Sequence, residues 1–425
     1  MTLLYQSYNA PLECPTARTQ WRGMEPARSD SFSYNGRNEL TASSLGAAPY
    51  GYSYDNIGNR KTAREPAGEL AYAANGLNQY TGIEESGEAP FVPTYDASGN
   101  QTLIKTSTGI WTAVYNAANR AVSFTSRDGA TVVECGYDYQ GRRYMKKVTQ
   151  NGTVASHERY LYRGYLQIAA LDMLDNRNVL RTLLWDPLEP MATRPLALVQ
   201  GASLYCYGVD FNKNVSEVFD AQGTIAAAYD YSPYGAVTGT GSLVQPVQWS
   251  AEMHDEDFAL VYYNYRYYNP RDGRWINRDP IAEKGGWNLY AFLGNSTQDK
   301  FDTFGLQALD SLSNTVIQGL AAGKISEVAT LLGYSTTAAL VAALIEGGYK
   351  LKCKACNPPV GSQRQQCHRN HTHNGWNPHY HIFTVNQSPI VAGCRCFDKR
   401  TTISNNPNYP EYTGRPTGGG IEVIK

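Results

Sequence analysis

Five of the seven histidines lie close together near the end of the chain, in the segment CHRNHTHNGWNPHYHIF. His371 and His373 are two residues apart, as are His379 and His381, and the turn-forming sequence NGWNP separates the pairs. Residues two apart on a strand point to the same face, so a hairpin here would place four imidazoles on one surface. Such a group suits a divalent metal or a general acid and base. The alternative is a surface hairpin without function.

Five of the eight cysteines stand in the same region. Cys353 and Cys356 form a C-x-x-C pair and Cys394 and Cys396 form a C-x-C pair, with Cys367 between them. Two such pairs a few dozen residues apart are typical of a structural tetrahedral zinc site. Disulfide bonds are the alternative if the domain reaches an oxidising compartment, and we favour zinc. A redox-active pair is disfavoured because the surrounding βαβ pattern is missing.

The basic character of this region indicates what it binds. Residues 351–425 carry nine Lys and Arg against three Asp and Glu, whereas residues 1–350 carry 28 against 35. A cationic surface around a metal or histidine site fits a polyanion whose phosphates Lys and Arg neutralise. We therefore expect a metal-dependent nuclease acting on nucleic acid, in which one or more of the four histidines binds the metal and another acts as base or polarises water. An ordinary solvated face, or a patch that meets an acidic immunity protein, is the alternative.

The rest of the chain is rich in residues that favour strands and turns. It contributes to totals of 32 Tyr, 39 Gly and 21 Pro, and tyrosine favours strands while glycine marks turns. A degenerate unit of Tyr-Asp or Tyr-Asn followed by Gly or Asn recurs at residues 54–60, 95–100, 115–120 and 137–143. In each unit Tyr ends a strand, Asp starts the turn by bonding its own backbone, and Gly supplies the positive φ. A single hairpin cannot bury its face, so the units must stack.

Residues 262–306 carry an ordered set of motifs. The motif residues are Arg266, Tyr267, Tyr268, Gly273, Arg274, Trp275, Arg278, Asp279, Pro280, Gly285, Gly286, Asn288, Leu289, Tyr290, Ala291, Phe292, Asn295, Asp302, Gly305 and Leu306. With these motifs and the looser repeats, the chain resembles the RHS-repeat (YD-repeat) family, and specifically its RHS-associated core. The resemblance implies strands that wind into a hollow shell, which the core segment plugs or closes. It also implies a polymorphic secreted toxin whose variable C-terminal segment is the toxic cargo; the C subunits of insecticidal Tc complexes look similar.

The same resemblance implies self-cleavage within the core. In the family two aspartates act like an aspartic-protease pair and cut the chain after the closing Gly-Leu. On this sequence the pair matches Asp279 and Asp302, with Arg278 in support, and the cut bond is Leu306–Gln307. One carboxyl of such a pair stays protonated as the acid while the other activates water. Taken without the resemblance, both aspartates are simply turn formers.

The chain also departs from the family's pattern. Ala282 stands where glycine is usual, and Thr303 where proline is common. Family members usually run far longer, so we expect a truncated shell from the C-terminal end of such a protein, or a displaced gene fragment.

The predicted fold is mainly β, with stacked YD-repeat strands followed by a small α+β C-terminal domain. After Leu306, apolar residues at three- and four-residue spacings predict an amphipathic helix. The expected parts are a poorly defined N-terminal segment (1–29), the YD-repeat region (30–200), the RHS-associated core (201–306), a helical linker (307–349) and the Cys/His-rich basic domain (350–425).

The sequence also bears on location and on other functions. The longest apolar stretch, from Ala338 to Ile345, is too short to span a membrane, and the start MTLLYQSYNAPLECP lacks the pattern of an ordinary secretory signal. We expect a protein that is made in the cytoplasm and then exported by another route or displayed at the cell surface. Two other functions stay open. One is a non-enzymatic surface or carbohydrate-binding protein whose tail is a zinc-stabilised interaction module, and the other is an inactive gene fragment.

Overall fold

The computed structural model describes residues 14–22, 25–186, 194–210, 212–302 and 304–306, and the backbone of short strands at 5–8 and between 309 and 424. The chain divides into two compact units, residues 1–187 with 192–311 and residues 188–191 with 312–425. The larger unit holds the repeats and the core segment. The described elements are strands with three short 3₁₀ turns, which confirms the predicted mainly-β fold.

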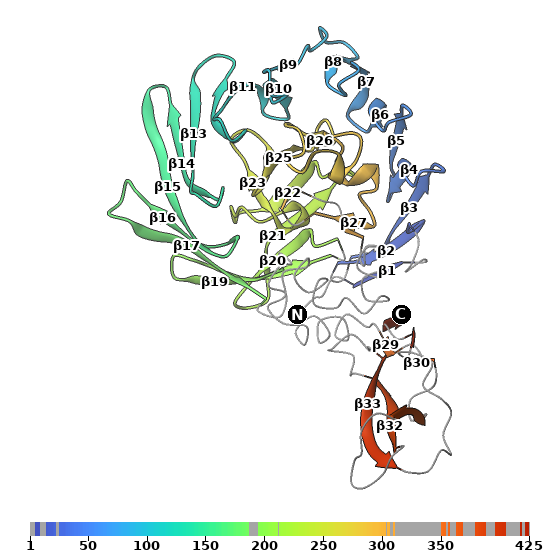
Figure 1. Cartoon of the computed structure of the whole chain (residues 1–425). Helices are drawn as coiled ribbons and strands as arrows, with labels where there is room; N and C mark the ends of the chain where they lie inside the picture. Colours follow the sequence, from blue (N-terminus) through green and yellow to red (C-terminus); the bar gives the residue numbers. More distant parts are fainter. Residues whose placement is uncertain are drawn as a thin grey trace. The chain divides into compact units, whose positions relative to one another are not determined.

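The first sheet of the larger unit has eight antiparallel strands, each paired with the next one in the chain (Figure 1). Its strands are β1 (Tyr5–Tyr8), β2 (Ala17–Trp21), β3 (Arg28–Tyr34), β4 (Leu40–Leu45), β5 (Ala48–Tyr54), β6 (Arg60–Glu65), β7 (Gly68–Ala74) and β8 (Tyr80–Glu85). Alternate residues of β3 and β7 are buried, because one face of the sheet covers an apolar core and the other meets solvent.

The second sheet has fourteen strands in the same sequential order. Its strands are β9 (Thr94–Tyr95), β10 (Gln101–Thr106), β11 (Gly109–Tyr115), β12 (Ala121–Ser126), β13 (Thr131–Tyr137), β14 (Arg143–Gln150), β15 (Thr153–Arg163), β16 (Leu166–Asp172), β17 (Asn178–Trp185), β18 (Pro195–Gln200), β19 (Ser203–Val209), β20 (Val215–Asp220), β21 (Ile225–Tyr231) and β22 (Val237–Gly241). Buried apolar residues of this sheet, such as Ile104, Phe124 and Leu198, form a second core.

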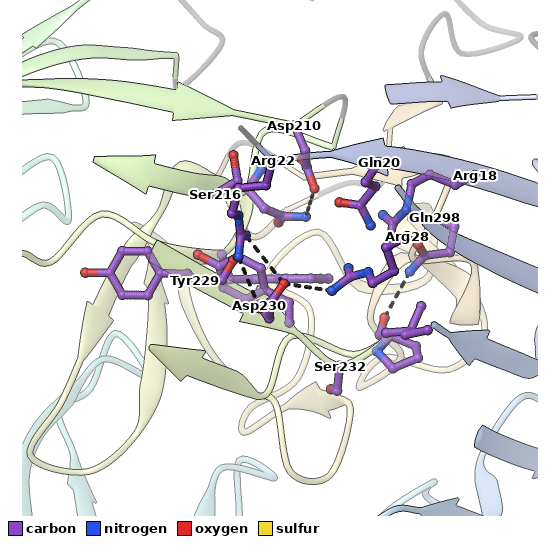
Figure 2. A pocket seen from close by; sticks show the side chains of 15 residues that line it. Arg18, Gln20, Arg22, Arg28, Asp210, Ser216, Tyr229, Asp230, Ser232 and Gln298 are labelled. Atoms are coloured by element: carbon purple, nitrogen blue, oxygen red, sulfur yellow. Dashed lines mark hydrogen bonds and ion pairs between the residues drawn. The ribbon is translucent and has the colours of Figure 1, made fainter. Parts of the chain in front are cut away.

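Side-chain ion pairs join the start of the first sheet to the end of the second (Figure 2). Arg22, just after β2, lies 2.6 Å from Glu217 of β20 and 3.3 Å from Asp230 of β21. Arg28 of β3 lies 2.8 Å from the same Asp230 carboxylate. A cavity of about 30 Å³ lies between these strands. Both sheets therefore curve around a common interior, as expected for a shell.

The same hydrogen bonds hold the turns of the repeats together. Oδ1 of Asp55, Asp96 and Asp138 accepts hydrogen bonds from the backbone N–H groups two and four residues later. The glycine three residues later has a φ of +78° to +84°, which glycine adopts without steric cost. Asn35 and Asn75 start two further turns of this kind that the sequence analysis missed, and in both an asparagine takes the place of the glycine. The predicted turns are thus confirmed.

The tyrosine before each turn ties its repeat to the previous one. In five repeats its hydroxyl donates a hydrogen bond to the carbonyl of the residue that begins the strand after the previous turn, whereas the hydroxyl of Tyr95 accepts one from the N–H of Tyr80 at 3.1 Å. The pairs are Tyr54 with Leu40 (2.6 Å), Tyr115 with Gln101 (2.8 Å), Tyr137 with Ala121 (2.7 Å), Tyr162 with Arg143 (2.7 Å) and Tyr231 with Val215 (2.7 Å). Burial raises the pKa of these phenols, so they remain donors. Phenylalanine would fill the same space and leave a carbonyl unpaired.

The core segment follows the second sheet, and its strands lie between the two sheets in Figure 1. Its elements are η1 (Trp249–Ala251), β23 (Met253–Asp255), β24 (Leu260–Tyr263), β25 (Arg266–Asn269), β26 (Arg274–Trp275), η2 (Ala282–Gly285), η3 (Leu293–Asn295) and β27 (Lys300–Phe301). Aromatic rings hold it together: Tyr268 stacks on Phe292 with 3.8 Å between ring centroids, and both pack against Trp275.

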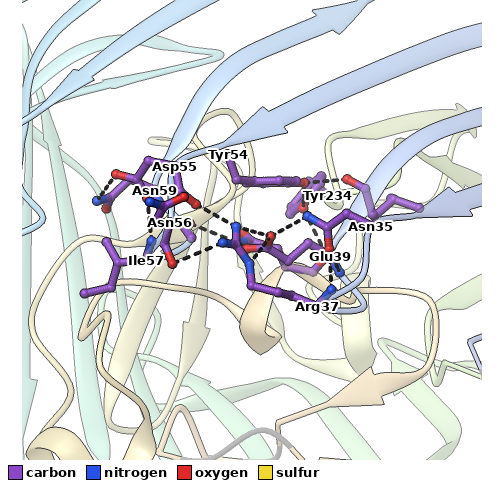
Figure 3. Close-up of polar contacts among 12 residues, drawn as sticks. Asn35, Arg37, Glu39, Tyr54, Asp55, Asn56, Ile57, Asn59 and Tyr234 are labelled. Atoms are coloured by element: carbon purple, nitrogen blue, oxygen red, sulfur yellow. Dashed lines mark hydrogen bonds and ion pairs between the residues drawn. The ribbon is translucent and has the colours of Figure 1, made fainter.

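Side chains of the core segment bind successive turns of the shell. Figure 3 shows the first two turns, which Arg37 links by donating to the carbonyls of Asp55 (2.6 Å) and Asn56 (3.1 Å). The contacts from the core are Asn295 to the Gly58 carbonyl (2.9 Å), Asn288 to the Asn59 side chain (2.9 Å), Arg274 to the Asn78 carbonyl (2.9 Å) and Tyr290 to the Gly99 carbonyl (2.7 Å). These four core residues belong to the motif set, so part of that motif serves to recognise turns.

The smaller unit contains short antiparallel strands. They are β29 (Lys350–Cys353) paired with β35 (Ile421–Ile424), β30 (Cys356–Asn357) paired with β34 (Thr417–Gly418), and a sheet of β31 (Gln363–His368), β32 (His379–Gln387) and β33 (Cys396–Ser404).

Most of the predicted helical segment, residues 311–349, lies outside the described residues. At its start the helix prediction is wrong: β28 (Leu309–Asp310) is a strand, because its backbone pairs with β27. Within the described part of the chain, no helix is long and apolar enough to cross a membrane.

Candidate functional site

Asp279 and Asp302 reach the same arginine. Asp279 lies after β26, Asp302 directly after β27, and Arg266 begins β25. Nη2 of Arg266 lies 2.9 Å from Oδ2 of Asp279 and 4.0 Å from Oδ2 of Asp302. The side chains are 2% (Arg266), 7% (Asp279) and 3% (Asp302) exposed. The structure therefore brings the two aspartates named from the sequence together around one buried cation.

Each aspartate also closes a turn, using its other oxygen. Oδ1 of Asp279 accepts a hydrogen bond from the N–H of Ile281 at 2.9 Å. Oδ1 of Asp302 accepts from the N–H groups of Phe304, Gly305 and Leu306 at 2.9, 2.8 and 3.3 Å. The turn-forming role considered from the sequence is therefore present, and it leaves Oδ2 of both carboxyls directed at Arg266.

Burial governs the protonation of this group. It raises the pKa of both Asp279 and Asp302, although the Arg266 cation acts in the opposite direction. It also lowers the pKa of Arg266 to about 10, which leaves the guanidinium charged at neutral pH. One cation beside two buried carboxyls favours a single proton on the two carboxyls, because the group is then neutral.

The backbone that leads to Leu306 is held against the same arginine. Nε of Arg266 donates to the carbonyl of Gly305 at 2.5 Å. Gly305 has a φ of +73°, and a Cβ there would lie 3.0 Å from the carbonyl oxygen of Tyr263. Glycine is therefore required for this close approach. The chain is fixed next to the carboxyl pair one residue before the carbonyl of the proposed cut bond.

Gly285 and Ala282 shape the loop over Asp279. A Cβ on Gly285 would collide with the Asp279 carboxylate, so only glycine fits there. Ala282 has a φ of +53°, in the left-handed region that glycine enters freely and alanine does not. This explains why glycine is usual at that position, and it means that the loop is strained in this chain. Thr303, the other departure from the pattern, lies outside the described residues.

Arg278 does not reach the carboxyl site, although it directly precedes Asp279 in the chain. Its side chain is exposed and lies over Gly99, where an added Cβ would be 2.6 Å from Cδ of Arg278. The arginine at the carboxyl pair is Arg266, which the sequence analysis quoted as part of the motif but did not select. Its signal was present in the motif Arg-Tyr-Tyr, whereas Arg278 was named from the family resemblance.

The histidines and cysteines of the tail are described in part. His379 and His381 lie in β32, where they face His368 and Gln366 of β31 in the strand register. The structure places Cys353 in β29, Cys356 in β30 and Cys396 in β33. His371, His373 and Cys394 lie outside the described residues.

The sequence matches the protein family described as Teneurin YD-shell over residues 17–295, more than half of the chain. The chain belongs to this family. The resemblance to YD-repeat proteins drawn from the tyrosine repeats and the core motifs is thereby confirmed.

Known relatives of this YD-shell protein include toxins. The tRNA3(Ser)-specific nuclease WapA of Bacillus spizizenii is 26% identical over 259 residues, which are 58% of this chain and 10% of WapA. The toxin subunit YenC2 of Yersinia entomophaga is 26% identical over 293 residues, which are 61% of this chain and 29% of YenC2. The chain thus spans less than a third of either relative.

A solved structure shares the fold. The crystal structure of TcdB2-TccC3-TEV matches with a TM-score of 0.51 at 17% identity, over 71% of this chain and 18% of that one. The shell described above therefore has the same fold as part of that structure.

Proposed function

We propose that the chain is the C-terminal part of an RHS toxin that cuts itself after Leu306 and so frees residues 307–425 as its cargo. The observation that carries the proposal is the convergence of Asp279 and Asp302 on the buried Arg266, beside the backbone of residues 304–306. The relatives WapA and YenC2, a nuclease and a toxin subunit, support the same assignment.

The proposed reaction is hydrolysis by a carboxyl pair that shares one proton. The ionised carboxylate takes a proton from a water molecule, whose oxygen adds to the carbonyl carbon of Leu306. The protonated carboxyl gives its proton to the carbonyl oxygen. The C–N bond to Gln307 then breaks, and the nitrogen leaves as an amine with the proton first taken from water. One hydroxyl of the intermediate returns its proton to the other carboxylate, which restores the proton of the pair and leaves Leu306 with a new carboxyl group. Arg266 positions both carboxyls and the Gly305 carbonyl for these steps.

Intact mass measurement of the purified full chain tests this proposal. We expect two fragments that meet at Leu306 and Gln307, and an intact chain in Asp279→Asn and in Asp302→Asn. Asp299→Asn is the matched control, because its carboxylate pairs with Ser296 instead of Arg266. A wild-type protein that stays a single species of 46.9 kDa would contradict self-cleavage.

For the cargo we propose a metal-dependent nuclease. The support is the net positive charge of residues 351–425, the two His-x-His pairs and the nuclease name of the WapA relative. One or more of His371, His373, His379 and His381 would bind zinc or another divalent metal, and the others would act on the water that attacks the phosphodiester. Cys353, Cys356, Cys394 and Cys396 would hold a structural zinc.

Metal content and nuclease activity of the full chain separate this cargo from its alternatives. We expect bound metal, cleavage of plasmid DNA or tRNA, and loss of cleavage in His371→Ala or His381→Ala but not in His157→Ala. Bound zinc without cleavage of either substrate favours the non-enzymatic interaction module. Neither metal nor cleavage favours an inactive fragment.

One partner and one export route follow from the toxin proposal. An acidic immunity protein would bind the basic tail in the producing cell, and the toxin would leave the cytoplasm by a route other than an ordinary signal peptide. For the immunity protein, we expect an acidic protein to co-purify with the basic residues 351–425 and to dissociate at high salt.

A further inference from the structure

Gly99 lies under two side chains of the core segment. It occupies the glycine position of the turn that Asp96 starts, with a φ of +84°. A Cβ at this position would lie 2.6 Å from Cδ of Arg278 and 2.7 Å from the hydroxyl of Tyr290. That hydroxyl also donates to the Gly99 carbonyl at 2.7 Å. The backbone of the turn and the core are therefore in direct contact, with no room for a methyl group.

The turn at Gly223 has the same construction without this contact. Asp220 starts it with the same two hydrogen bonds, and Gly223 has a φ of +82°. Nothing lies within 4 Å of the point where its Cβ would be. Alanine would thus cause the same backbone strain at Gly223 as at Gly99, and it would disturb the core at Gly99 alone.

The two residues over Gly99 are direct chain neighbours of the carboxyl site. Arg278 precedes Asp279, and Tyr290 follows Leu289. The N–H of Asp279 donates to the carbonyl of Leu289 at 2.9 Å, which joins the two segments. Arg266 reaches the same carbonyl at 3.4 Å. Arg278 and Tyr290 of these two joined segments therefore contact the turn of the shell. Asp279, in the first of the two segments, contacts Arg266.

We propose that the Asp96–Asn100 turn is a positioning element for the carboxyl site: contact of Gly99 with Arg278 and Tyr290 holds Asp279 against Arg266. This inference rests on the self-cleavage proposed above. It makes cleavage conditional on docking of this repeat, so a core segment that has not met the shell does not cut. It also gives Arg278 a role at a distance from the reacting atoms.

The test compares Gly99→Ala with Gly223→Ala in the full chain. We expect a larger loss in thermal stability in Gly99→Ala, because only its methyl group meets Arg278 and Tyr290. At a temperature where both variants are folded, cleavage after Leu306 should be about 100-fold slower in Gly99→Ala than in Gly223→Ala, because a shift of about 1 Å at a reacting group has an effect of that size. The acid limb of the pH profile of cleavage should also move to higher pH in Gly99→Ala, since Asp279 loses the cation that lowers its pKa. A purely structural role would leave that limb unchanged. Equal cleavage rates in the two variants would overturn the proposal.

Hydrogen exchange keeps the inference separate from the proposed function. In the Asp302→Asn background, which keeps the chain whole, the amide of Asp279 should exchange faster in Gly99→Ala than in Gly223→Ala. If the wild-type chain is not cut, the self-cleavage proposal fails, while faster exchange would still support the positioning contact. If exchange at Asp279 is the same in both variants, the positioning contact is wrong even when the wild-type chain is cut.

Discussion

Replacing Asp255 by asparagine should destabilise the larger unit by about 3 kcal/mol. Asp255 ends β23 of the core segment and forms ion pairs with Arg143 and Lys146 of β14. The side chains of Asp255 and Arg143 are only 3% and 4% exposed. The asparagine variant removes the negative charge, so Arg143 and Lys146 lose the Asp255 carboxylate as a partner in the interior.

The expected loss of stability follows from the burial of Asp255 and from the pKa of its carboxyl. Arg143 and Lys146 lower the pKa of Asp255 to about 2, against about 4 for a free aspartate. Each tenfold change in proton affinity is worth about 1.4 kcal/mol, so the ion pairs contribute about 2–3 kcal/mol above pH 4. Breaking a buried ion pair by removing one partner costs about 3–5 kcal/mol. The two estimates meet at about 3 kcal/mol, the loss of stability expected for Asp255→Asn.

Asp257→Asn is the matched control. Asp257 lies 2.6 Å from the same Lys146, but its side chain is 26% exposed, so its removal should cost about 1 kcal/mol or less. Urea unfolding followed by circular dichroism measures both variants at pH 7. Because the folded-state pKa of Asp255 is lowered, its contribution is present above about pH 4 and is lost as the pH falls towards 2.

The stability gap between wild type and Asp255→Asn should therefore close over that pH range. Equal effects of the two asparagine variants at pH 7, or a gap that does not narrow in acid, would refute the reasoning.

Four further predictions concern stability, and urea unfolding checks each of them. Tyr137→Phe should cost about 1–2 kcal/mol, because the hydroxyl bond between repeats is lost, whereas Tyr139→Phe at a 92% exposed site should cost nothing measurable. Ala282→Gly should stabilise the chain by about 0.5 kcal/mol, since relief of a left-handed alanine outweighs the added flexibility of glycine; a loss of stability would show that the loop is not strained. Gly273→Ala should be among the most damaging single changes, at about 3 kcal/mol or more, because a Cβ there would collide with the buried Arg60 guanidinium. Burial lowers the pKa of His254 to about 4, so the neutral form is favoured on folding and stability falls as the pH drops below about 6.5; His254→Gln should flatten the stability profile between pH 6.5 and 4.

The shell could be predicted because its signals are local in the sequence. Tyr54, Asp55 and Gly58 each have a separate physical task within one turn, and the same three types recur at Tyr95, Asp96 and Gly99. Two of the turns that use asparagine for both the acidic residue and the glycine, at Asn35 and Asn75, escaped notice, although the one at Asn116 was recognised. An Asn-rich turn fits the same hydrogen bonds, yet it looks like any surface loop in a single sequence.

The carboxyl site could be predicted only in part. Asp279 and Asp302 were named through the family resemblance, since spacing alone does not distinguish them from turn formers. Arg278 was named with them through the same resemblance, and Arg266 was not considered for this role. What decides between these arginines is the folding of β25 against the segments that carry the two aspartates, a contact between residues 13 and 36 positions apart that no local pattern encodes.

The order of the strands has a consequence for synthesis. Every strand of the two large sheets pairs with the one made just before it, so a chain leaving the ribosome can add repeats one at a time. The bonds of Asn288 and Asn295 reach back 229 and 237 residues, and they form only after translation has passed the shell. The carboxyl site is built from segments that follow the shell, so it forms only after the shell has been synthesised. A shorter nascent chain therefore cannot undergo the proposed self-cleavage.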